Sequence, residues 1–111
     1  MKISLKSTNL DLTPSLKTYA ENKFGGLARL LQKYDSEGSA DIRVELARTT
    51  RHHHKGEVFM AEANLRLGGK TLRASEVSED IREAIDAVKR KIQLEIEKFK
   101  SKSDPVRKKT K

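Results

Sequence analysis

Cysteine and tryptophan are absent from this chain, and aromatic residues of all kinds make up only 5% of it. The absence of cysteine excludes a disulfide framework, a thiolate nucleophile and a cysteine-ligated metal. The scarcity of aromatic rings argues against a single-strand binder that holds its ligand by stacking many bases. No apolar run approaches the roughly 18–20 residues that a membrane-spanning helix needs, and the amino terminus lacks a signal-peptide core. We therefore expect a cytoplasmic protein with no membrane partner.

Charge, in contrast, is abundant. Charged residues account for 36% of the 111 residues and hydrophobic residues for 35%, and the formal net charge is +8. A chain of this length encloses a single core rather than two, and this composition predicts a lean one. A strongly basic surface suits a nucleic acid, an anionic membrane surface or an acidic protein partner.

The last third of the chain concentrates the positive charge on one predicted helix. Apolar residues recur there at steps of three and four, which places them on one helical face. They are Ile81, Ala84, Ile85, Val88, Ile92, Ile96 and Phe99. The cations around this stripe are Arg82, Lys89, Arg90, Lys91, Lys98 and Lys100. Residues 86–111 contain ten basic and four acidic side chains, so this region suits a polyanion.

Alternation and turn signals predict four strands and two helices. The strands cover residues 2–8, 40–47, 57–67 and 70–75. The first helix starts at Pro14 with Thr13 as its N-cap, and Ser78 caps the second. Gly25 and Gly26 interrupt the apolar stripe of the first helix, which indicates either a bend or a close approach to the backbone.

This order of elements predicts an α+β fold of the βαβββα type. The first strand–helix–strand unit makes a right-handed crossover, so its two strands run parallel. The later strands form an antiparallel meander, with Gly68 and Gly69 as a tight turn. Each helix has one apolar stripe to bury, so both should cover one face of a four-stranded mixed sheet, as in a double-stranded-RNA-binding domain. Residues 1–100 form this domain, and residues 101–111 a basic tail of disordered composition.

Several short segments, in their order and spacing, resemble one protein family. In the first half they are Asn9, Thr13, Leu16, Lys23-Phe24 and Leu27. In the second half they are Gly68-Gly69, Leu72-Arg73-Ala74, Glu79-Asp80-Ile81, Ala84-Ile85-Asp86, Lys91, Lys98, Lys100 and Lys102. This combination resembles the ribosome hibernation-promoting factors, also called ribosome-associated inhibitors or sigma-54 modulation proteins, over residues 2–102.

The resemblance implies a protein that binds the small ribosomal subunit in its decoding region and blocks messenger RNA and tRNA. It also implies that basic side chains of both helices grip ribosomal RNA. Carried over by position, these are Lys23, Lys91 and Lys98. The chain departs from the family pattern at Arg82, where a tyrosine is common, and at Gly26, where a second cation is common. It resembles the short family members, and the alternative that it is the N-terminal domain of a long member stays open. A ribosome-dimerising protein also stays open as a further partner.

Residues 48–55, Arg-Thr-Thr-Arg-His-His-His-Lys, form a second cationic element. Neighbouring side chains in an extended segment point in alternate directions, and no cysteine or carboxylate pair stands nearby, so a zinc site is the weaker interpretation. A loop that faces RNA, with imidazoles that gain charge below about pH 6.5, is favoured. A loop without function stays open.

The candidate RNA-binding residues share a basic or titratable side chain. They are Lys23, Arg29, Arg48, Arg51, His52, Lys55, Arg82, Lys89, Arg90, Lys91 and Lys98. We expect the cations of the two helices to flank one groove, which the loop at residues 48–55 extends. The residues of this groove are Lys23, Arg29, Arg82, Lys89, Arg90 and Lys91. Contacts of this kind bind phosphate without reading base sequence.

Nothing in the sequence supports catalysis, a cofactor or a small-molecule substrate. No serine stands in a nucleophile elbow. The acidic residues are explained as strand exteriors or as favourable charges at a helix start. They are Glu57, Glu62, Glu76, Glu79 and Asp80. Two alternatives to a ribosome-binding factor stay open: a general double-stranded-RNA-binding module and a protein-interaction domain.

Overall fold

The computed structural model describes residues 1–32, 40–49 and 58–103, and its elements follow the predicted order. They are β1 (Lys2–Thr8), α1 (Pro14–Gly25), the 3-10 helix η1 (Gly26–Leu31), β2 (Ala40–Arg48), β3 (Phe59–Leu67), β4 (Lys70–Ser78) and α3 (Ile81–Ser103). The predicted α+β fold with the βαβββα order is confirmed. No helix of the described ranges combines the length and apolarity that crossing a membrane requires.

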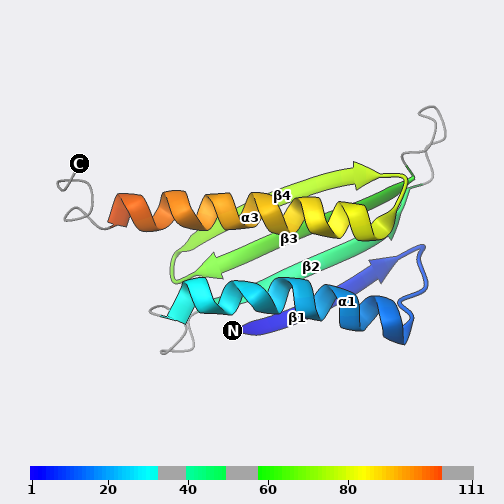
Figure 1. The fold of residues 1–111 in the computed structure, drawn as a ribbon, viewed down its shortest axis with the longest axis horizontal. Helices are drawn as coiled ribbons and strands as arrows, with labels where there is room; N and C mark the ends of the chain where they lie inside the picture. Colours follow the sequence, from blue (N-terminus) through cyan, green and yellow to red (C-terminus); the bar gives the residue numbers. More distant parts are fainter. Residues whose placement is uncertain (33–39, 50–57, 104–111) are drawn as a thin grey trace.

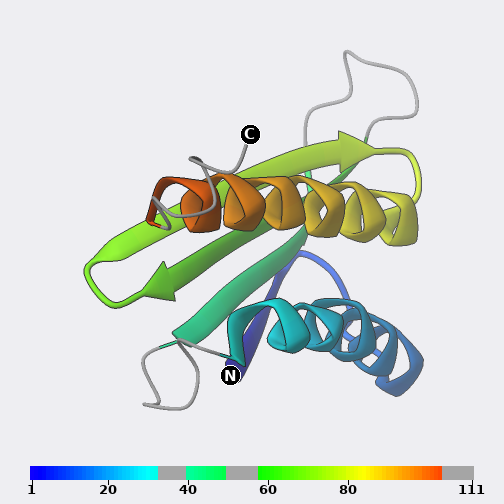
Figure 2. The ribbon, with the colours of Figure 1, turned by 60° about the vertical axis from the view of Figure 1, so that its left-hand side comes forward.

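The four strands form one mixed sheet in the order β1-β2-β3-β4. β1 runs parallel to β2, as the predicted crossover requires, and the β2–β3 and β3–β4 pairs are antiparallel. The helices cover one face of this sheet, with α3 over β3 and β4 and α1 near β1 (Figures 1 and 2). We call α1, η1 and α3 the helix layer, and the opposite side of the sheet the open face.

The core lies between the sheet and the helix layer. Alternate residues of β2, namely Ile42, Val44 and Leu46, are buried under the helices. From α3, the fully buried residues are Ala84, Ile85, Val88, Ile92 and Ile96. Burying a valine or isoleucine side chain contributes about 1.5–3 kcal/mol to folding. The apolar stripe predicted from the sequence therefore holds α3 on the sheet.

The first helix begins at Thr13 and Pro14 as predicted. The Thr13 side chain accepts a hydrogen bond from the Leu16 amide at 3.2 Å. The α-helical pattern ends at Gly25 and continues as the 3-10 helix η1. A Cβ added to Gly25 or Gly26 would meet nothing within 4 Å, so no described segment approaches the backbone there. The glycine pair marks a change of helix type instead.

The start of α3 differs from the prediction. The Asp80 carbonyl accepts the first α-helical hydrogen bond, from the Ala84 amide at 3.0 Å, and its carboxylate accepts from the Arg82 amide at 2.9 Å. Asp80 therefore takes the N-cap position, and the assignment of Ser78 was wrong. The reason is the partner strand: Phe59 pairs with Ser78, so β4 runs three residues beyond its predicted end.

The turn between β3 and β4 agrees with its sequence. Gly68 has a φ of 61°, in the left-handed region that favours glycine. The register brings Leu67 opposite Lys70, so the two residues between them close a hairpin of the predicted length.

Candidate nucleic-acid interface

One polar cluster joins α1 to α3 in the helix layer. The Tyr19 hydroxyl donates a hydrogen bond of 2.7 Å to Oδ1 of Asp86. Lys23 Nζ lies 3.4 Å from the same carboxylate oxygen. The Lys23 ammonium and the Arg82 guanidinium lie 5.5 and 5.3 Å from the centroid of the Tyr19 ring. Two predicted RNA contacts, Lys23 and Arg82, are thus brought together from distant parts of the sequence.

The cluster changes the acidity of Tyr19. The hydrogen bond to Asp86 is the largest cause that raises the pKa of Tyr19 above 10.0, because ionisation would remove the donated proton. Burial and the negative charge of Asp86 act in the same direction, while the positive charge of Arg82 lowers the pKa. The phenol therefore remains a hydrogen-bond donor at physiological pH.

Lys89 and Arg90 follow on α3 with different surroundings. Lys89 is half-buried and donates a hydrogen bond of 3.2 Å to the Gln93 side chain. It lies one turn beyond Asp86, so it continues the side of α3 that faces α1. The Arg90 side chain is exposed and forms no hydrogen bond or ion pair within the described residues.

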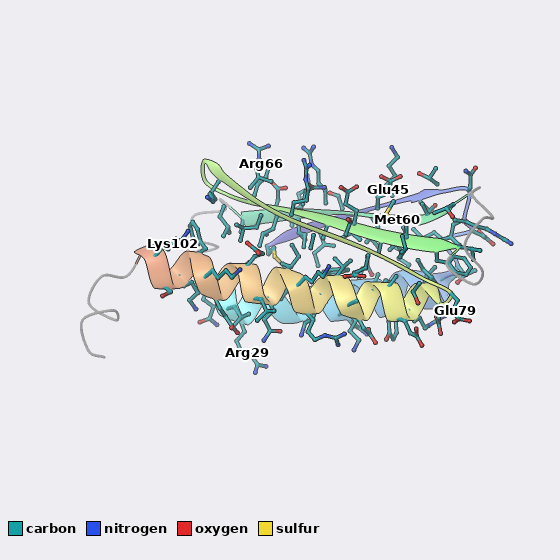
Figure 3. All side chains as sticks on the ribbon, turned by 90° about the horizontal axis from the view of Figure 1, so that it is seen from above. Arg29, Glu45, Met60, Arg66, Glu79 and Lys102 are labelled. Atoms are coloured by element: carbon teal, nitrogen blue, oxygen red, sulfur yellow. The ribbon has the colours of Figure 1, made fainter. Side chains whose placement is uncertain are left out.

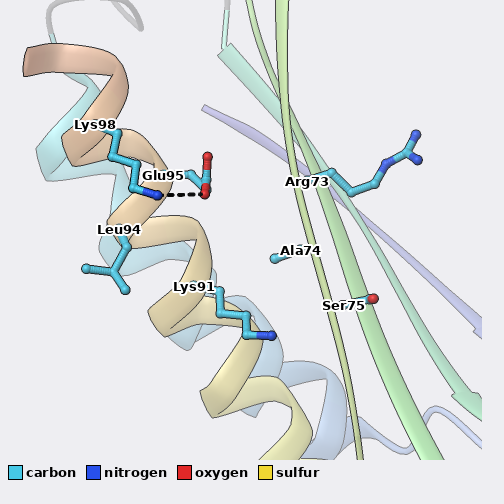
Figure 4. A pocket seen from close by; sticks show the side chains of 7 residues that line it. All are labelled: Arg73, Ala74, Ser75, Lys91, Leu94, Glu95 and Lys98. Atoms are coloured by element: carbon cyan, nitrogen blue, oxygen red, sulfur yellow. Dashed lines mark ion pairs between the residues drawn. The ribbon is translucent and has the colours of Figure 1, made fainter. Parts of the chain in front are cut away.

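Lys91 and Lys98 lie on the other side of α3, toward β4. Lys91 forms an ion pair with Glu76 of β4, and Lys98 Nζ lies 3.8 Å from a Glu95 oxygen. Both line an open groove of about 540 Å³ between α3 and β4 (Figure 4). Since successive residues of a helix differ by about 100°, Lys91 points away from the side that holds Lys89. The expectation that Lys91 and Lys89 flank one groove was wrong.

Glu76 is a second correction to the sequence analysis. It was expected on the exterior of its strand, but it is half-buried and pairs with Lys91 of the covering helix. The alternation of β4 explains this position, because Leu72 and Ala74 are buried and Glu76 continues the same face. Had the strand been predicted to continue past residue 75, the same alternation would have placed Glu76 on the face that the helix covers.

The remaining predicted residues are dispersed. Arg29 is exposed on η1, beside a shallow depression that Gly25 and Gly26 also line. Arg48 ends β2, with its guanidinium 6.0 Å from the centroid of the Phe59 ring. The other three loop residues of the prediction, Arg51, His52 and Lys55, lie outside the described residues. Within residues 1–32, 40–49 and 58–103, no group of histidine and acidic side chains could hold a metal ion.

Sequence reasoning missed the roles of Tyr19 and Asp86. Tyr19 was not among the predicted RNA-binding residues, and Asp86 entered only as part of a family-like segment. The contact between them depends on how the two helices lie against each other. Neither residue alone has a signal for it in the sequence.

These features define a small α+β domain whose sheet is covered on one face by two helices rich in lysine and arginine. The chain belongs to the sigma 54 modulation protein / S30EA ribosomal protein family, whose family model matches residues 3–104.

Curated relatives and solved structures agree with this membership. The chain is 30% identical to the ribosome hibernation promotion factor of Lactococcus lactis subsp. cremoris over 102 residues, which are 91% of this chain and 50% of the relative. It is 31% identical to that of Bacillus subtilis over 102 residues, 92% of this chain and 50% of the relative. The chain thus spans about half the length of these relatives.

Two solved structures have the same fold. The Thermus thermophilus Protein Y N-terminal domain superposes with a TM-score of 0.70 at 25% identity, covering 89% of this chain and 99% of that domain. A ribosomal subunit interface protein from Coxiella burnetii gives a TM-score of 0.71 at 21% identity, covering 91% of this chain and 99% of that one. The second likeness concerns the fold alone.

Proposed function

We propose that this chain is a ribosome hibernation factor that binds the small ribosomal subunit near its decoding region. Bound there, it blocks messenger RNA and tRNA by occupying the space that they need. The observation that carries the proposal is the gathering of Lys23, Arg82 and Lys89 on one side of the helix layer. The names of the Lactococcus and Bacillus relatives support it as well.

The binding chemistry is phosphate neutralisation. Each lysine or arginine beside the RNA backbone releases condensed counterions, so affinity depends steeply on salt. Contacts to phosphate fix the position and orientation of a protein without reading bases. That property suits a protein that must fit one location on a folded RNA.

The Tyr19–Asp86 cluster prepares two of these cations for binding. It holds Lys23 and Arg82 beside one ring and one carboxylate, so fewer rotamers are lost when a phosphate arrives. The Lys23–Asp86 pair is exposed to solvent, with 40% and 36% of the two side chains accessible. Exposed pairs contribute about 0–1 kcal/mol, so a phosphate can replace the carboxylate at small cost.

Inhibition by occlusion needs affinity and a rigid shape rather than a chemical step. The proposal therefore includes no cofactor, no substrate and no turnover. Such a protein acts in the cytoplasm, where the small subunit meets messenger RNA. The proposal concerns this domain alone. It assigns no function to the part of the relatives that this chain does not match.

Co-sedimentation with purified ribosomal subunits tests this function. At ~100 mM salt, phosphate-dominated binding should survive, and we expect saturable binding to the small subunit alone. Messenger RNA and initiator tRNA, bound beforehand, should prevent the protein from binding. Equal binding to both subunits and to plain duplex RNA would contradict the proposal and favour a general double-stranded-RNA-binding module.

A further inference from the structure

The open face of the sheet has a chemistry of its own. Residues paired across neighbouring strands share a face, so the strand register defines rows across it. One row consists of Ser4, Arg43, Asn64 and Arg73. The next row, toward the β3–β4 turn, consists of Lys2, Asp41, Arg66 and Thr71. Figure 3 shows Arg66 pointing away from the helices, while Arg29 extends from the opposite side of the molecule.

Arg43, Arg66 and Arg73 form what we call the open-face arginine patch. All three side chains are exposed. With strands about 4.8 Å apart and about 3.4 Å of rise per residue, Arg43 and Arg73 lie about 10 Å apart across Asn64. On the same geometry Arg66 lies about 8 Å from each of them. The patch thus places three guanidinium groups over a small area of one sheet surface.

The guanidinium groups of the patch are largely free to bind a ligand. The side chains of Arg43 and Arg66 form no hydrogen bond or ion pair in the part of the chain that the structure describes, although Asp41 stands directly opposite Arg66 in the register and two residues from Arg43. Arg73 donates a hydrogen bond of 2.7 Å from Nε to the Asn64 side chain. That bond leaves its terminal nitrogens unused and orients the group, which Figure 4 shows pointing away from α3.

The surroundings of the patch favour phosphate over protein. Its neighbours in the two rows are Lys2, Ser4, Asp41, Asn64 and Thr71. All of them are polar or charged, so the patch lacks the apolar centre that a protein–protein interface has. It also lacks an aromatic ring on which a base could stack. Arginine forks bind phosphate oxygens with two donors. The patch therefore has the composition of an RNA-backbone contact.

The half of the open face that lies farther from the β3–β4 turn has acidic and apolar side chains instead of a group of arginines. Glu45 and Glu62 stand directly opposite each other there, and Thr8 donates a hydrogen bond of 2.7 Å to Glu45. Met60 and the 47% exposed Val77 follow in the last row. Positive charge is thus concentrated on the half nearer the β3–β4 turn.

We propose that the open-face arginine patch is a second RNA-contact surface, which binds the phosphate backbone of a segment other than the one on the helix layer. The two surfaces lie on opposite sides of the sheet, so one molecule bridges two RNA segments. This inference adds a second surface to the proposed function. It predicts that a single molecule holds two duplexes at once.

A bridging experiment with short duplex RNA tests the inference. Two duplexes of about 16 base pairs, the length that one double-stranded-RNA-binding domain spans, bear a donor and an acceptor fluorophore. Wild-type protein at limiting concentration should produce energy transfer between them, and excess protein should abolish it as each duplex acquires its own molecule. The sheet variant R43Q/R66Q/R73Q should bind one duplex without energy transfer. The slope of log K for RNA binding against log salt concentration should become shallower by about 2 to 3 in this variant, because three phosphate contacts are lost.

A control variant separates the patch from general charge. K6Q/K17Q/K102Q removes the same number of positive charges at exposed positions that belong neither to the open-face arginine patch nor to the group of Lys23, Arg82 and Lys89, and it should bridge as wild type does. If the sheet variant fails to fold, Arg43→Gln alone removes a side chain without a described partner, and it should weaken energy transfer. Energy transfer in the sheet variant equal to that of wild type would overturn the inference.

A helix variant, K23Q/R82Q/K89Q, distinguishes this inference from the proposed function. Loss of energy transfer in both the helix and the sheet variant, with one duplex still bound by each, supports two surfaces. A helix variant that bridges normally would overturn the assignment of the helix layer and the bridging inference with it. A wild-type protein that never bridges, but binds one duplex through the helix layer, would overturn the inference and leave the proposed function intact.

Discussion

Tyr19 connects the polar groups of α1 and α3 in the helix layer. Its hydroxyl donates to Asp86 on the other helix, and its ring lies beside Lys23 and Arg82. A net hydrogen bond to a charged group contributes about 1.5–3 kcal/mol, although partial exposure of Asp86 lowers that value here. One side chain therefore links the packing of two helices to the positions of two basic groups.

Removing Asp86 should lower the pKa of Tyr19. In a Tyr34→Phe background, Tyr19 is the only tyrosine of the chain, and its ultraviolet absorbance then reports one ionisation. We expect a midpoint above 10.0, and a midpoint closer to 10.0 when Asp86→Ala is added, because this change removes the acceptor of the hydrogen bond that is the largest cause of the shift. Identical midpoints in the two proteins would contradict the assigned cause.

The same shift sets the sign of a stability effect at high pH. Because the pKa of Tyr19 is higher in the folded chain than in the unfolded one, its contribution is complete below about pH 10. The contribution is lost as the pH rises through the folded pKa. As the pH rises above about 10, the free energy of unfolding should therefore fall less for Tyr19→Phe than for wild type. Urea denaturation at a series of pH values measures this difference.

At the scale of the element, the first helix depends on its N-cap. Thr13 accepts the amide hydrogen of Leu16, and Pro14 supplies a backbone already restricted to the helical φ. Thr13→Ala should lower the free energy of unfolding by about 1 kcal/mol. Thr18→Ala is the matched control, since Thr18 is exposed inside the same helix and alanine has the higher helix propensity. Equal loss in both variants, measured by urea denaturation, would rule out a capping effect.

The two sides of α3 should contribute unequally to RNA binding. Lys89 continues the side that faces α1, whereas Lys91 is paired with Glu76 on the β4 side. Lys89→Gln should lower small-subunit affinity more than Lys91→Gln, with a decrease in salt slope of about 0.7–0.9 for one lost phosphate contact. Each variant is the charge-matched control of the other. A larger effect at Lys91 would move the RNA surface to the groove beside β4.

For the whole molecule, stability and RNA affinity should respond differently to truncation. The described core ends at Ile96, with Phe99 packed against it, whereas residues 104–111 carry four basic side chains and one acidic one. A chain that ends at Ser103 should unfold at the temperature of the full chain. Its affinity for small subunits should nevertheless fall, with a shallower salt slope. A clear drop in unfolding temperature, measured by calorimetry, would show that the last residues support the fold.

The sequence predicted the fold well because its signals are local. Alternation predicted the strand over residues 40–47, in which Ile42 and Val44 are buried. Steps of three and four placed Ile85 and Ile92 on one helical face, and both are buried. Glycine at position 68 marked the only described glycine with a left-handed backbone. Periodicity fails at ends of elements, and so Ser78 was assigned to a helix start although its pairing with Phe59 keeps it in β4.

The sequence by itself determined which residues face the core, how the strands connect, and that positive charge lies along the last helix. Only the tertiary structure decided which charged groups meet. The packing of α1 against α3 brings Tyr19 to Asp86, and the register of β2, β3 and β4 places Arg43 and Arg73 on either side of Asn64. The physical reason is that periodicity fixes the direction of a side chain within its own element. Contacts between elements depend on their relative rotation and displacement, which the packing of the whole core sets.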